Sequence, residues 1–252
     1  MQLRSQRGVK TLLGAIFVFS ALLLTGCENG SVYGYEADLS SVNETSWHLW
    51  RGAWLAAGAV GIFTAALILW PVLRHRRKEG DPQYPKQTQY NIPVEIAYTI
   101  IPFVIVAVLF YFTARDQAVI TAKEPSQVQH TIDVTGFQWS WQFGHQDGGK
   151  EAVVTGTPAQ PPTLVLPQGE RVAFNIYSPD VVHGFWIPAF MIQIQNIPGV
   201  TNRIEFTANK LGEYPGRCNI LCGRNHSQMV FKVKVVTPEE YDTYVETLKA
   251  GA

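Results

Sequence analysis

The distribution of apolar residues divides the chain into two parts of different character. Two long uncharged apolar runs, at 52–73 and 96–114, occur in the first part. Each approaches the roughly 20 residues that a membrane-spanning helix needs. From residue 116 onward, apolar and polar residues alternate in short segments, as they do in strands with one buried face. The pattern therefore predicts an α+β membrane protein, with a two-helix transmembrane hairpin at 45–115 and a β domain at 116–252.

The β domain is predicted from short segments separated by glycine and proline. In residues 230–236, three apolar side chains face one side and two lysines face the other. Short strands with such regular breaks are typical of a sandwich or a barrel. Thr237 then provides an N-cap and Glu240 a capping-box acid, so a helix is predicted to about Lys249. The predicted strands are 129–137, 163–166, 171–177, 202–207 and 230–236.

Charged and aromatic residues orient the hairpin. The loop between the apolar runs carries the basic stretch 74–78, which the positive-inside rule places in the cytoplasm. Both ends of the hairpin then lie outside, and so does everything after Arg115. Four tryptophans lie near the ends of the first run, as interfacial aromatics do: Trp47, Trp50, Trp54 and Trp70.

Residues 1–26 have the pattern of an export signal. Basic residues precede an apolar stretch, and Leu24-Thr25-Gly26-Cys27 resembles a bacterial lipobox, in which cleavage leaves Cys27 as a lipidated N-terminus. The alternative is an uncleaved anchor with an incidental cysteine. Small residues before Cys27 and polar residues after it favour lipidation, and they make Cys27 an anchor rather than a metal ligand.

Composition limits the classes of function. Lys plus Arg and Asp plus Glu number 20 each, so the net charge of zero implies no general attraction for nucleic acid. The chain has 3 cysteines, and Cys27 is far from the other pair, so the cysteines do not form a disulfide framework.

The stretch with the most specific chemistry lies near the end of the chain. Cys218, Cys222, His226 and Met229 follow one another at Cys-x3-Cys-x3-His-x2-Met spacing. Thiolate, imidazole and thioether together form a soft donor set, and copper is the first-row metal that most readily uses all three. A disulfide in an oxidising compartment and half of a structural zinc site are alternatives that spacing alone leaves open.

A second histidine is needed to complete a metal site. His183 is the best candidate, because it is predicted to follow a strand and enter a loop, where a rigid β scaffold often presents ligands. His48 and His75 lie at or beyond the membrane boundary. His145 lies in a glycine-rich segment and is expected to be exposed.

Three further residues have both a structural and a functional interpretation. Trp139 and Trp141, at i and i+2 of a predicted strand, are expected on one face, either as sheet packing or as an indole surface offered to a redox partner. Glu95 begins the second apolar run, where it is either a favourable helix N-terminal charge or part of a proton pathway.

Taken together, the chain from about residue 45 onward resembles subunit II of haem–copper oxygen reductases of the cytochrome c oxidase type. The resemblance rests on the hairpin and on these motifs: Pro93-x-Glu95 with Pro102, Gln138-Trp139-x-Trp141, Asp180-Val-Val-His183, Ile197-Pro198-Gly199 and the cluster from Cys218 to Met229.

The resemblance implies a fold and a site. The fold would be a cupredoxin-like β-sandwich on the two-helix anchor, and the site would be the dinuclear copper centre CuA. Cys218 and Cys222 would bridge two coppers. His183 and His226 would each cap one copper, and Met229 and the backbone carbonyl of Ile220 would be further ligands. Trp139 would receive the electron, and Glu95 would lie at the mouth of a proton channel.

The resemblance also implies partners and a location. The chain would be part of a cytochrome-c oxidase in a bacterial cell membrane, as a multi-pass protein with its C-terminal domain extracytoplasmic. Electrons from cytochrome c or a membrane-tethered haem c donor would pass to subunit I, where oxygen is reduced with proton translocation. Subunit III and membrane lipids are further expected partners, and nucleic acid is not.

Two residues depart from the family pattern. Ile220 and Gln195 occupy positions where the family usually has carboxylates for Mg²⁺ or Mn²⁺ at the border with subunit I. Isoleucine cannot ligate, and glutamine is a poorer ligand than a carboxylate. The second metal site is therefore predicted to be absent or altered.

Three other functions compete with this one. A quinol oxidase subunit II would share the fold but lack CuA, against the complete ligand set here. A copper carrier would need an exposed site and would have no use for Trp139, Trp141 and Glu95. A divergent paralogue that assembles poorly is indicated only by Ile220 and Gln195.

Overall fold

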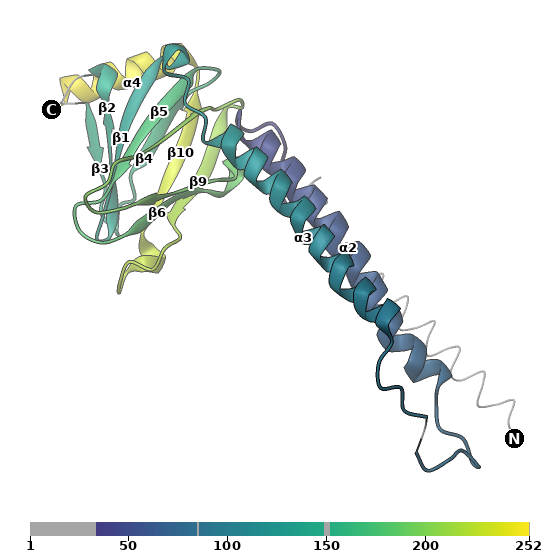
Figure 1. Cartoon of the computed structure of the whole chain (residues 1–252). Helices are drawn as coiled ribbons and strands as arrows, with labels where there is room; N and C mark the ends of the chain where they lie inside the picture. The colour runs from purple at the N-terminus through teal and green to yellow at the C-terminus, as the bar shows by residue number, and fades with distance from the viewer. Residues whose placement is uncertain (1–33, 85, 149–151, 252) are drawn as a thin grey trace, which may run out of the picture. The chain divides into compact units, whose positions relative to one another are not determined.

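The computed structural model describes residues 34–84, 86–148 and 152–251. The predicted signal peptide at 1–26 and the predicted lipidation at Cys27 lie outside the described residues. Two long helices come first, α2 (Asn43–Arg74) and α3 (Ile92–Ile120), and they run side by side in Figure 1. Both are long and apolar enough to cross a membrane.

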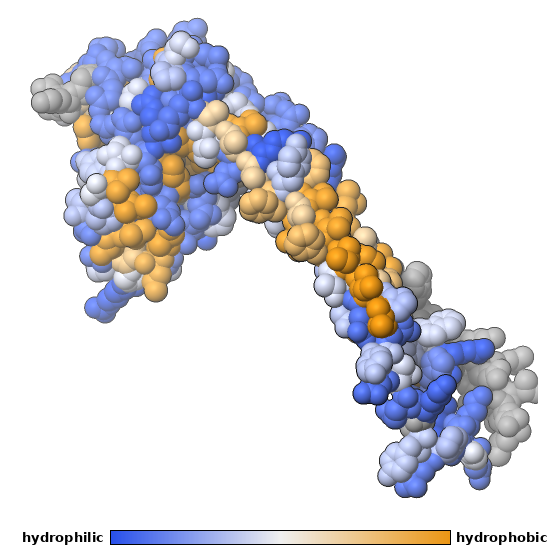
Figure 2. Space-filling view, in the orientation of Figure 1, coloured by the Kyte–Doolittle hydropathy of each residue, from blue (hydrophilic) through white to orange (hydrophobic). Residues whose placement is uncertain are grey.

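The two helices extend beyond the apolar runs that predicted them. α3 begins four residues earlier, because Asn91 caps it by accepting the Val94 N–H at 3.4 Å. The Glu95 carboxylate accepts the Asn91 N–H at 2.9 Å, which satisfies a further backbone donor at this end of the helix. Figure 2 shows a continuous apolar surface along the helices, with hydrophilic residues at the hairpin's loop. Such a surface fits a lipid environment rather than water.

The rest of the chain forms a β-sandwich of two five-stranded sheets, β3-β2-β1-β5-β8 and β4-β10-β9-β6-β7. β1 pairs with β5, and β4 with β10, in parallel; all other neighbours are antiparallel. The strands are β1 (His130–Phe137), β2 (Ser140–His145), β3 (Val153–Thr155), β4 (Thr163–Pro167), β5 (Arg171–Tyr177), β6 (His183–Ile187), β7 (Ile192–Asn196), β8 (Asn202–Thr207), β9 (Gly212–Cys218) and β10 (Val230–Val236).

Short 3₁₀ turns and one helix complete the domain. The turns are η1 (Pro125–Gln127), η2 (Gln146–Gly148), η3 (Pro188–Phe190) and η4 (His226–Gln228). The predicted C-terminal helix is confirmed as α4 (Pro238–Ala250), and the Thr237–Glu240 capping box is present. The predicted two-helix hairpin followed by a β-sandwich is confirmed.

Aromatic rings fill the space between the sheets beneath the cysteine cluster. Phe185 and Phe231 stack with ring centroids 5.2 Å apart, and both meet the edge of Trp141. All three side chains are buried. Phe174 and Phe206 form a second stack at 4.6 Å. Interleaved rings of this kind bury large apolar areas and hold the sheets at a fixed separation.

The prediction that Trp139 and Trp141 share one face of a strand is wrong. β1 ends at Phe137 and β2 begins at Ser140, so Trp139 lies in the turn between them. Trp141 points into the core, whereas Trp139 is half-buried at the edge of the sandwich. The turn reverses the chain and gives the two indoles different surroundings.

The expectation that His145 is exposed is also wrong. His145 ends β2 and is fully buried against α4, with Nδ1 3.0 Å from the Tyr241 hydroxyl. Burial lowers the pKa of His145 to about 4, so the ring is neutral at physiological pH. Tyr241 and Val245 are the buried residues of α4, and they fix the helix to the sandwich.

A neighbouring histidine has the opposite environment. His130 lies between two carboxylates, with Nδ1 2.6 Å from Asp147 and Nε2 2.7 Å from Glu170. Burial opposes the charged form, but hydrogen bonds and charge attraction from Asp147 and Glu170 raise the pKa of His130 above its usual 6.5. The protonated ring is therefore more stable in the folded protein than in the unfolded chain.

This arrangement predicts a pH dependence of stability. Because the folded-state pKa is raised, the contribution of His130 is complete below about pH 6.5 and is lost as the pH rises through the folded value. We expect the unfolding free energy of wild type to exceed that of His130→Gln most at acidic pH. Urea unfolding of both proteins across neutral pH measures the difference, and a difference independent of pH would contradict it.

Candidate metal centre

The loop between β9 and β10 carries four of the predicted ligands. Cys218 ends β9, and its N–H donates to the Met229 carbonyl at 2.9 Å, which closes the loop at its base. Gly223, within the loop, has φ +120°, and a Cβ there would lie 3.2 Å from Trp139 Nε1. A side chain at this position would be strained and would separate the loop from the Trp139 turn.

His183 reaches the loop from the neighbouring strand. It follows strand β5, as predicted, but it begins β6, so the prediction that it enters a loop is wrong. β6 pairs with β9, with Phe185 opposite Cys218. Gly184 lies between His183 and Phe185 in β6. A larger residue does not fit there, because a Cβ would clash with the side-chain amide of Asn219. The pairing brings His183 beside Cys218 and places its side chain in the protein interior.

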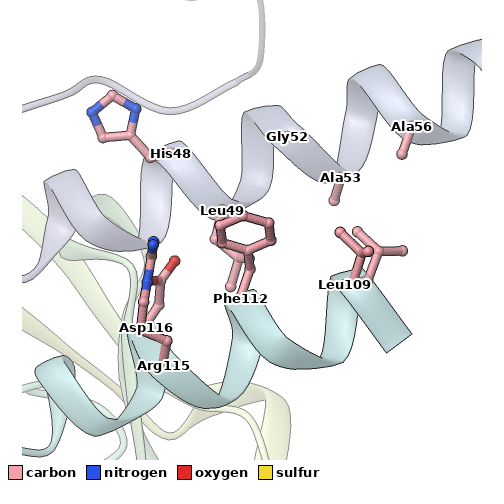
Figure 3. A pocket seen from close by; sticks show the side chains of 10 residues that line it. His48, Leu49, Gly52, Ala53, Ala56, Leu109, Phe112, Arg115 and Asp116 are labelled. Carbon is pink, nitrogen blue, oxygen red and sulfur yellow. The ribbon is translucent and has the colours of Figure 1, made fainter. Parts of the chain in front are cut away.

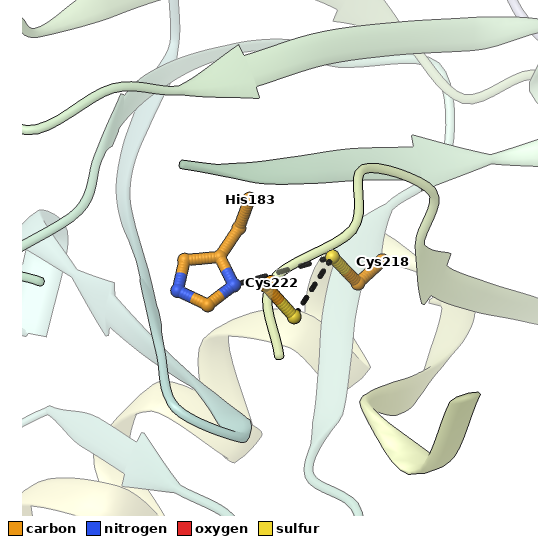
Figure 4. Close-up of side chains that lie close together, drawn as sticks. All are labelled: His183, Cys218 and Cys222. Carbon is orange, nitrogen blue, oxygen red and sulfur yellow. Dashed lines mark hydrogen bonds between the residues drawn. The ribbon is translucent and has the colours of Figure 1, made fainter. Parts of the chain in front are cut away.

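The donor atoms form a connected chain. Figure 4 shows His183, Cys218 and Cys222 converging, with Nδ1 of His183 4.0 Å from Cys218 Sγ and the two sulfurs 3.8 Å apart. Cys222 Sγ also lies 3.5 Å from His226 Nδ1 and 3.8 Å from Met229 Sδ. All five side chains predicted as copper ligands are thus brought together.

The spacing of these atoms fits metal coordination. Metal–sulfur bonds are about 2.3 Å and metal–nitrogen bonds about 2.0 Å, so two donors of one ion lie at most about 4.3–4.6 Å apart. Each neighbouring pair above meets this limit. A disulfide would need the sulfurs at about 2.05 Å, whereas they are 3.8 Å apart and the cysteines are free. The disulfide alternative for Cys218 and Cys222 is therefore wrong for this structure.

His226 does not join the inner group of ligand atoms. Ligand atoms of His183, Cys218 and Cys222 all lie within 4.8 Å of one another, and this is the one such His, Cys, Asp or Glu group in the described part of the chain. A tetrahedral zinc ion held by both cysteines and both histidines would require all four atoms in that group. His226 instead lies outside the group, with its Nδ1 3.5 Å from Cys222 Sγ.

The Ile220 backbone also takes part. The Cys218 thiol donates to the Ile220 carbonyl, with 3.2 Å between Sγ and the oxygen. The carbonyl therefore faces the sulfur cluster, as its predicted role requires. The Ile220 side chain is half-buried, and a Cβ on Gly184 would lie 3.0 Å from it.

Gln195, the other residue that departs from the family pattern, pairs with Gly184 across β6 and β7 and is exposed. The predicted alteration of the second metal site remains a prediction.

The two thiols have unequal proton affinities. Burial opposes ionisation of Cys218, but hydrogen bonds from His183 and the Gly184 N–H lower its pKa below the usual thiol range. Burial and the Cys218 anion together raise the pKa of Cys222. One thiolate therefore forms readily, and the second forms when a cation offsets the repulsion between the sulfurs.

Asp180 holds the remote nitrogen of His183, a role that the sequence analysis did not assign. Its Oδ1 accepts from His183 Nε2 at 2.9 Å, and its Oδ2 accepts the Gln138 N–H at 2.7 Å. A carboxylate on the far ring nitrogen orients a ligating histidine and leaves Nδ1 free for the metal. The sequence could have indicated this role, because Asp180 precedes the candidate ligand His183 by three residues.

We expect Asp180→Asn to weaken copper binding while the fold is kept. An amide can accept from His183 or from Gln138 with its single oxygen, but not from both, and it has no negative charge. Loss of such outer partners typically lowers metal affinity by about 10–100-fold. Copper titration against a competing chelator measures the change. Asp242→Asn, an exposed carboxylate on α4, is the matched control and should bind as wild type does.

Trp139 is linked directly to the cluster. Its Nε1 donates to the Cys222 carbonyl at 3.2 Å, and Gln138 Nε2 donates to the same oxygen at 2.9 Å. The half-buried indole thus connects the protein surface with the backbone of a predicted ligand.

Glu95 lies in the first turn of α3, at the end that is farther along the chain from the β domain. It accepts a hydrogen bond from the Asn91 N–H, which agrees with a structural role at the helix N-terminus. Its predicted role in a proton pathway stays a prediction.

Comparisons with known proteins agree with these features. The family model "Cytochrome C oxidase subunit II, periplasmic domain" matches residues 159–236. "Probable cytochrome c oxidase subunit 2" of Streptomyces coelicolor is 40% identical over 240 residues, covering 79% of this chain and 74% of that protein. "Cytochrome c oxidase subunit 2" of Mycobacterium bovis is 33% identical over 302 residues, covering 95% and 82%.

One solved structure with a similar domain is the periplasmic domain of subunit II of cytochrome oxidase of Bradyrhizobium japonicum. It is 32% identical and covers 49% of this chain and 96% of its own, with a TM-score of 0.46.

Proposed function

The chain belongs to the cytochrome c oxidase subunit 2 family, and on that premise we propose that it receives electrons at a dinuclear copper centre and passes them to subunit I. Proteins of this family are components of a haem–copper terminal oxidase and bind copper. The observation that carries the proposal is the soft donor set with the Trp139 indole hydrogen-bonded to its backbone.

The ligands would be divided between two copper ions. Cys218, Cys222, His183 and His226 would hold the ions. Met229 and the Ile220 carbonyl would be additional ligands. The position of His226 outside the compact group of His183, Cys218 and Cys222 supports two ions over one. When bound, copper supplies one-electron redox chemistry at this site.

The protein's own residues keep the site rigid. Asp180 fixes the His183 ring, the Cys218 N–H fixes the base of the ligand loop, and the aromatic core lies beneath. Electron transfer is faster when the ligands move little between oxidation states, and a packed β scaffold limits such movement. Both cysteines are buried, which disfavours a carrier that must release its metal to a partner.

Trp139 would accept the electron from the donor. It lies at the surface end of the turn between β1 and β2, and its hydrogen bond to the Cys222 carbonyl provides a short bonded connection to a bridging ligand. The donor would be a cytochrome c or a membrane-tethered haem c domain. Since the net charge is zero, long-range steering by net charge is weak, which favours a tethered donor.

The membrane arrangement follows from the same proposal. Residues 45–115 would form the transmembrane hairpin in a bacterial cell membrane, with 116–252 outside. Residues 1–26 would be a signal peptide, and Cys27 would carry a lipid. Subunits I and III would be partners, and Glu95 would lie at the entrance of a proton channel of the complex.

The role of Trp139 is tested by replacing it with leucine in the assembled oxidase. We expect reduction of the oxidase by its haem donor to slow by about tenfold or more, while copper content and the copper absorption spectrum stay unchanged. Tyr177→Leu, at another exposed aromatic of the domain, is the matched control and should leave the rate unchanged. Unchanged reduction in Trp139→Leu would contradict the proposed route.

A further inference from the structure

The two membrane helices line an open cavity that the proposed function does not use. It has a volume of about 410 Å³ and lies between the first part of α2 and the last part of α3. Figure 3 shows α2 contributing Gly52, Ala53 and Ala56 to one wall and α3 contributing Leu109 and Phe112 to the other. Small-molecule sites in proteins have volumes of about 300–1,000 Å³.

The cavity exists because small residues of α2 face larger ones of α3. Gly52, Ala53 and Ala56 lie on one face of α2, because residues three and four apart in a helix are neighbours on its surface. Their short side chains leave space that Leu109 and Phe112 do not fill. The lining is therefore apolar over most of the cavity's length, as an acyl chain would require.

The cavity is polar at one end only. Arg115 and Asp116 line this end, and Arg115 Nε and one terminal nitrogen both lie 2.7 Å from Asp116 Oδ1. The Asp116 side chain is 6% exposed, whereas that of Arg115 is 54% exposed. The Arg115 guanidinium also lies over the Phe112 ring, 4.9 Å from its centroid. Further N–H donors of the guanidinium are available to an anionic group at the mouth.

We propose that this cavity binds one membrane phospholipid, with an acyl chain between α2 and α3 and the phosphate at Arg115. The ion pair at one end, whose guanidinium is the exposed partner, and the apolar lining beyond it match the two parts of a lipid. A helix of another subunit would need a groove along most of a span of roughly 20 residues, whereas the lining residues fall within 48–56 and 108–116. The inference requires the hairpin to cross the bilayer and is independent of the copper centre.

The test uses the assembled oxidase in vesicles that contain a phosphatidylglycerol with a photoreactive diazirine in its acyl chain. We expect irradiation to attach the lipid to α2 or α3 within 48–56 or 108–116, as peptide mass spectrometry would show. Excess inorganic phosphate should not reduce labelling, because the acyl chain contributes most of the binding. Loss of labelling with free phosphate would show an anion site and contradict the lipid proposal.

Two variants make the test specific. Ala53→Phe with Ala56→Leu fills the cavity and should abolish labelling there, whereas Ala59→Leu, outside the lining, should leave it unchanged. Haem and copper contents report assembly in each case. A photoreactive amino acid at Ala56 in otherwise wild-type oxidase gives a second measurement that needs no filled cavity. Attachment to lipid supports the proposal, and attachment to another subunit would overturn it.

Discussion

Cys222→Ser is expected to remove copper from the protein while leaving the β-sandwich folded. The Cys222 sulfur is the central donor, within 3.8 Å of Cys218 Sγ, 3.5 Å of His226 Nδ1 and 3.8 Å of Met229 Sδ. A serine hydroxyl is a hard, weakly acidic donor that does not replace a thiolate as a ligand for copper. Copper content by elemental analysis should fall to background, and reduction by the haem donor should be lost with it.

The control for this variant is Ser227→Ala, an exposed position in the same loop that supplies no donor. It should retain wild-type copper content. Circular dichroism of both variants should match wild type, because serine and cysteine have nearly the same shape. Wild-type copper content in Cys222→Ser would exclude Cys222 as a ligand.

Phe185→Ala is expected to produce the largest loss of stability in the domain. Phe185 is fully buried two residues after His183, stacks on Phe231 at 5.2 Å, and lies 5.8 Å from Trp141. Removing such a ring leaves a cavity and typically costs about 3–5 kcal/mol. Denaturant unfolding of the copper-free protein, followed by tryptophan fluorescence, measures the loss without a contribution from bound metal.

Leu221→Ala is the matched control, because Leu221 also lies near the site but is 82% exposed. Its unfolding free energy should stay within about 0.5 kcal/mol of wild type. Equal effects of the two substitutions would show that the aromatic layer beneath the proposed copper centre does not stabilise the sandwich as described.

Regular periodicity explains which elements the sequence predicted well. β5, β8 and β10 have the predicted bounds, and β1 and β4 differ by one residue. These strands alternate clearly or are bounded by turn residues. The Thr237 capping box could be recognised from local chemistry alone, because its hydrogen bonds join residues three apart.

The errors occur where tertiary contacts override the local pattern. β9 was missed because Gly212, Pro215 and Gly216 interrupt it, although a Cβ on Gly216 would clash with the Phe231 ring and glycine is therefore required there. The burial of His145 depends on α4, which is almost a hundred residues away along the chain. No local pattern could indicate that contact.

The proposed copper ligands show the same division. The spacing from Cys218 to Met229 predicted four donors that lie close together, because all four belong to one loop. The placement of His183 beside them depends on the pairing of β6 with β9, and the role of Asp180 depends on its contact with the Gln138 turn. The sequence indicated the residue types, and the sheet register brought them together.

The most direct test of the account counts the copper ions and asks whether they share one electron. The full chain, purified in detergent and loaded with copper, is analysed for metal content and by electron paramagnetic resonance. We predict about two copper ions per chain and a hyperfine pattern from one electron delocalised over two copper nuclei. A single copper with the pattern of one nucleus, or preferential binding of zinc, would contradict the dinuclear electron-transfer centre.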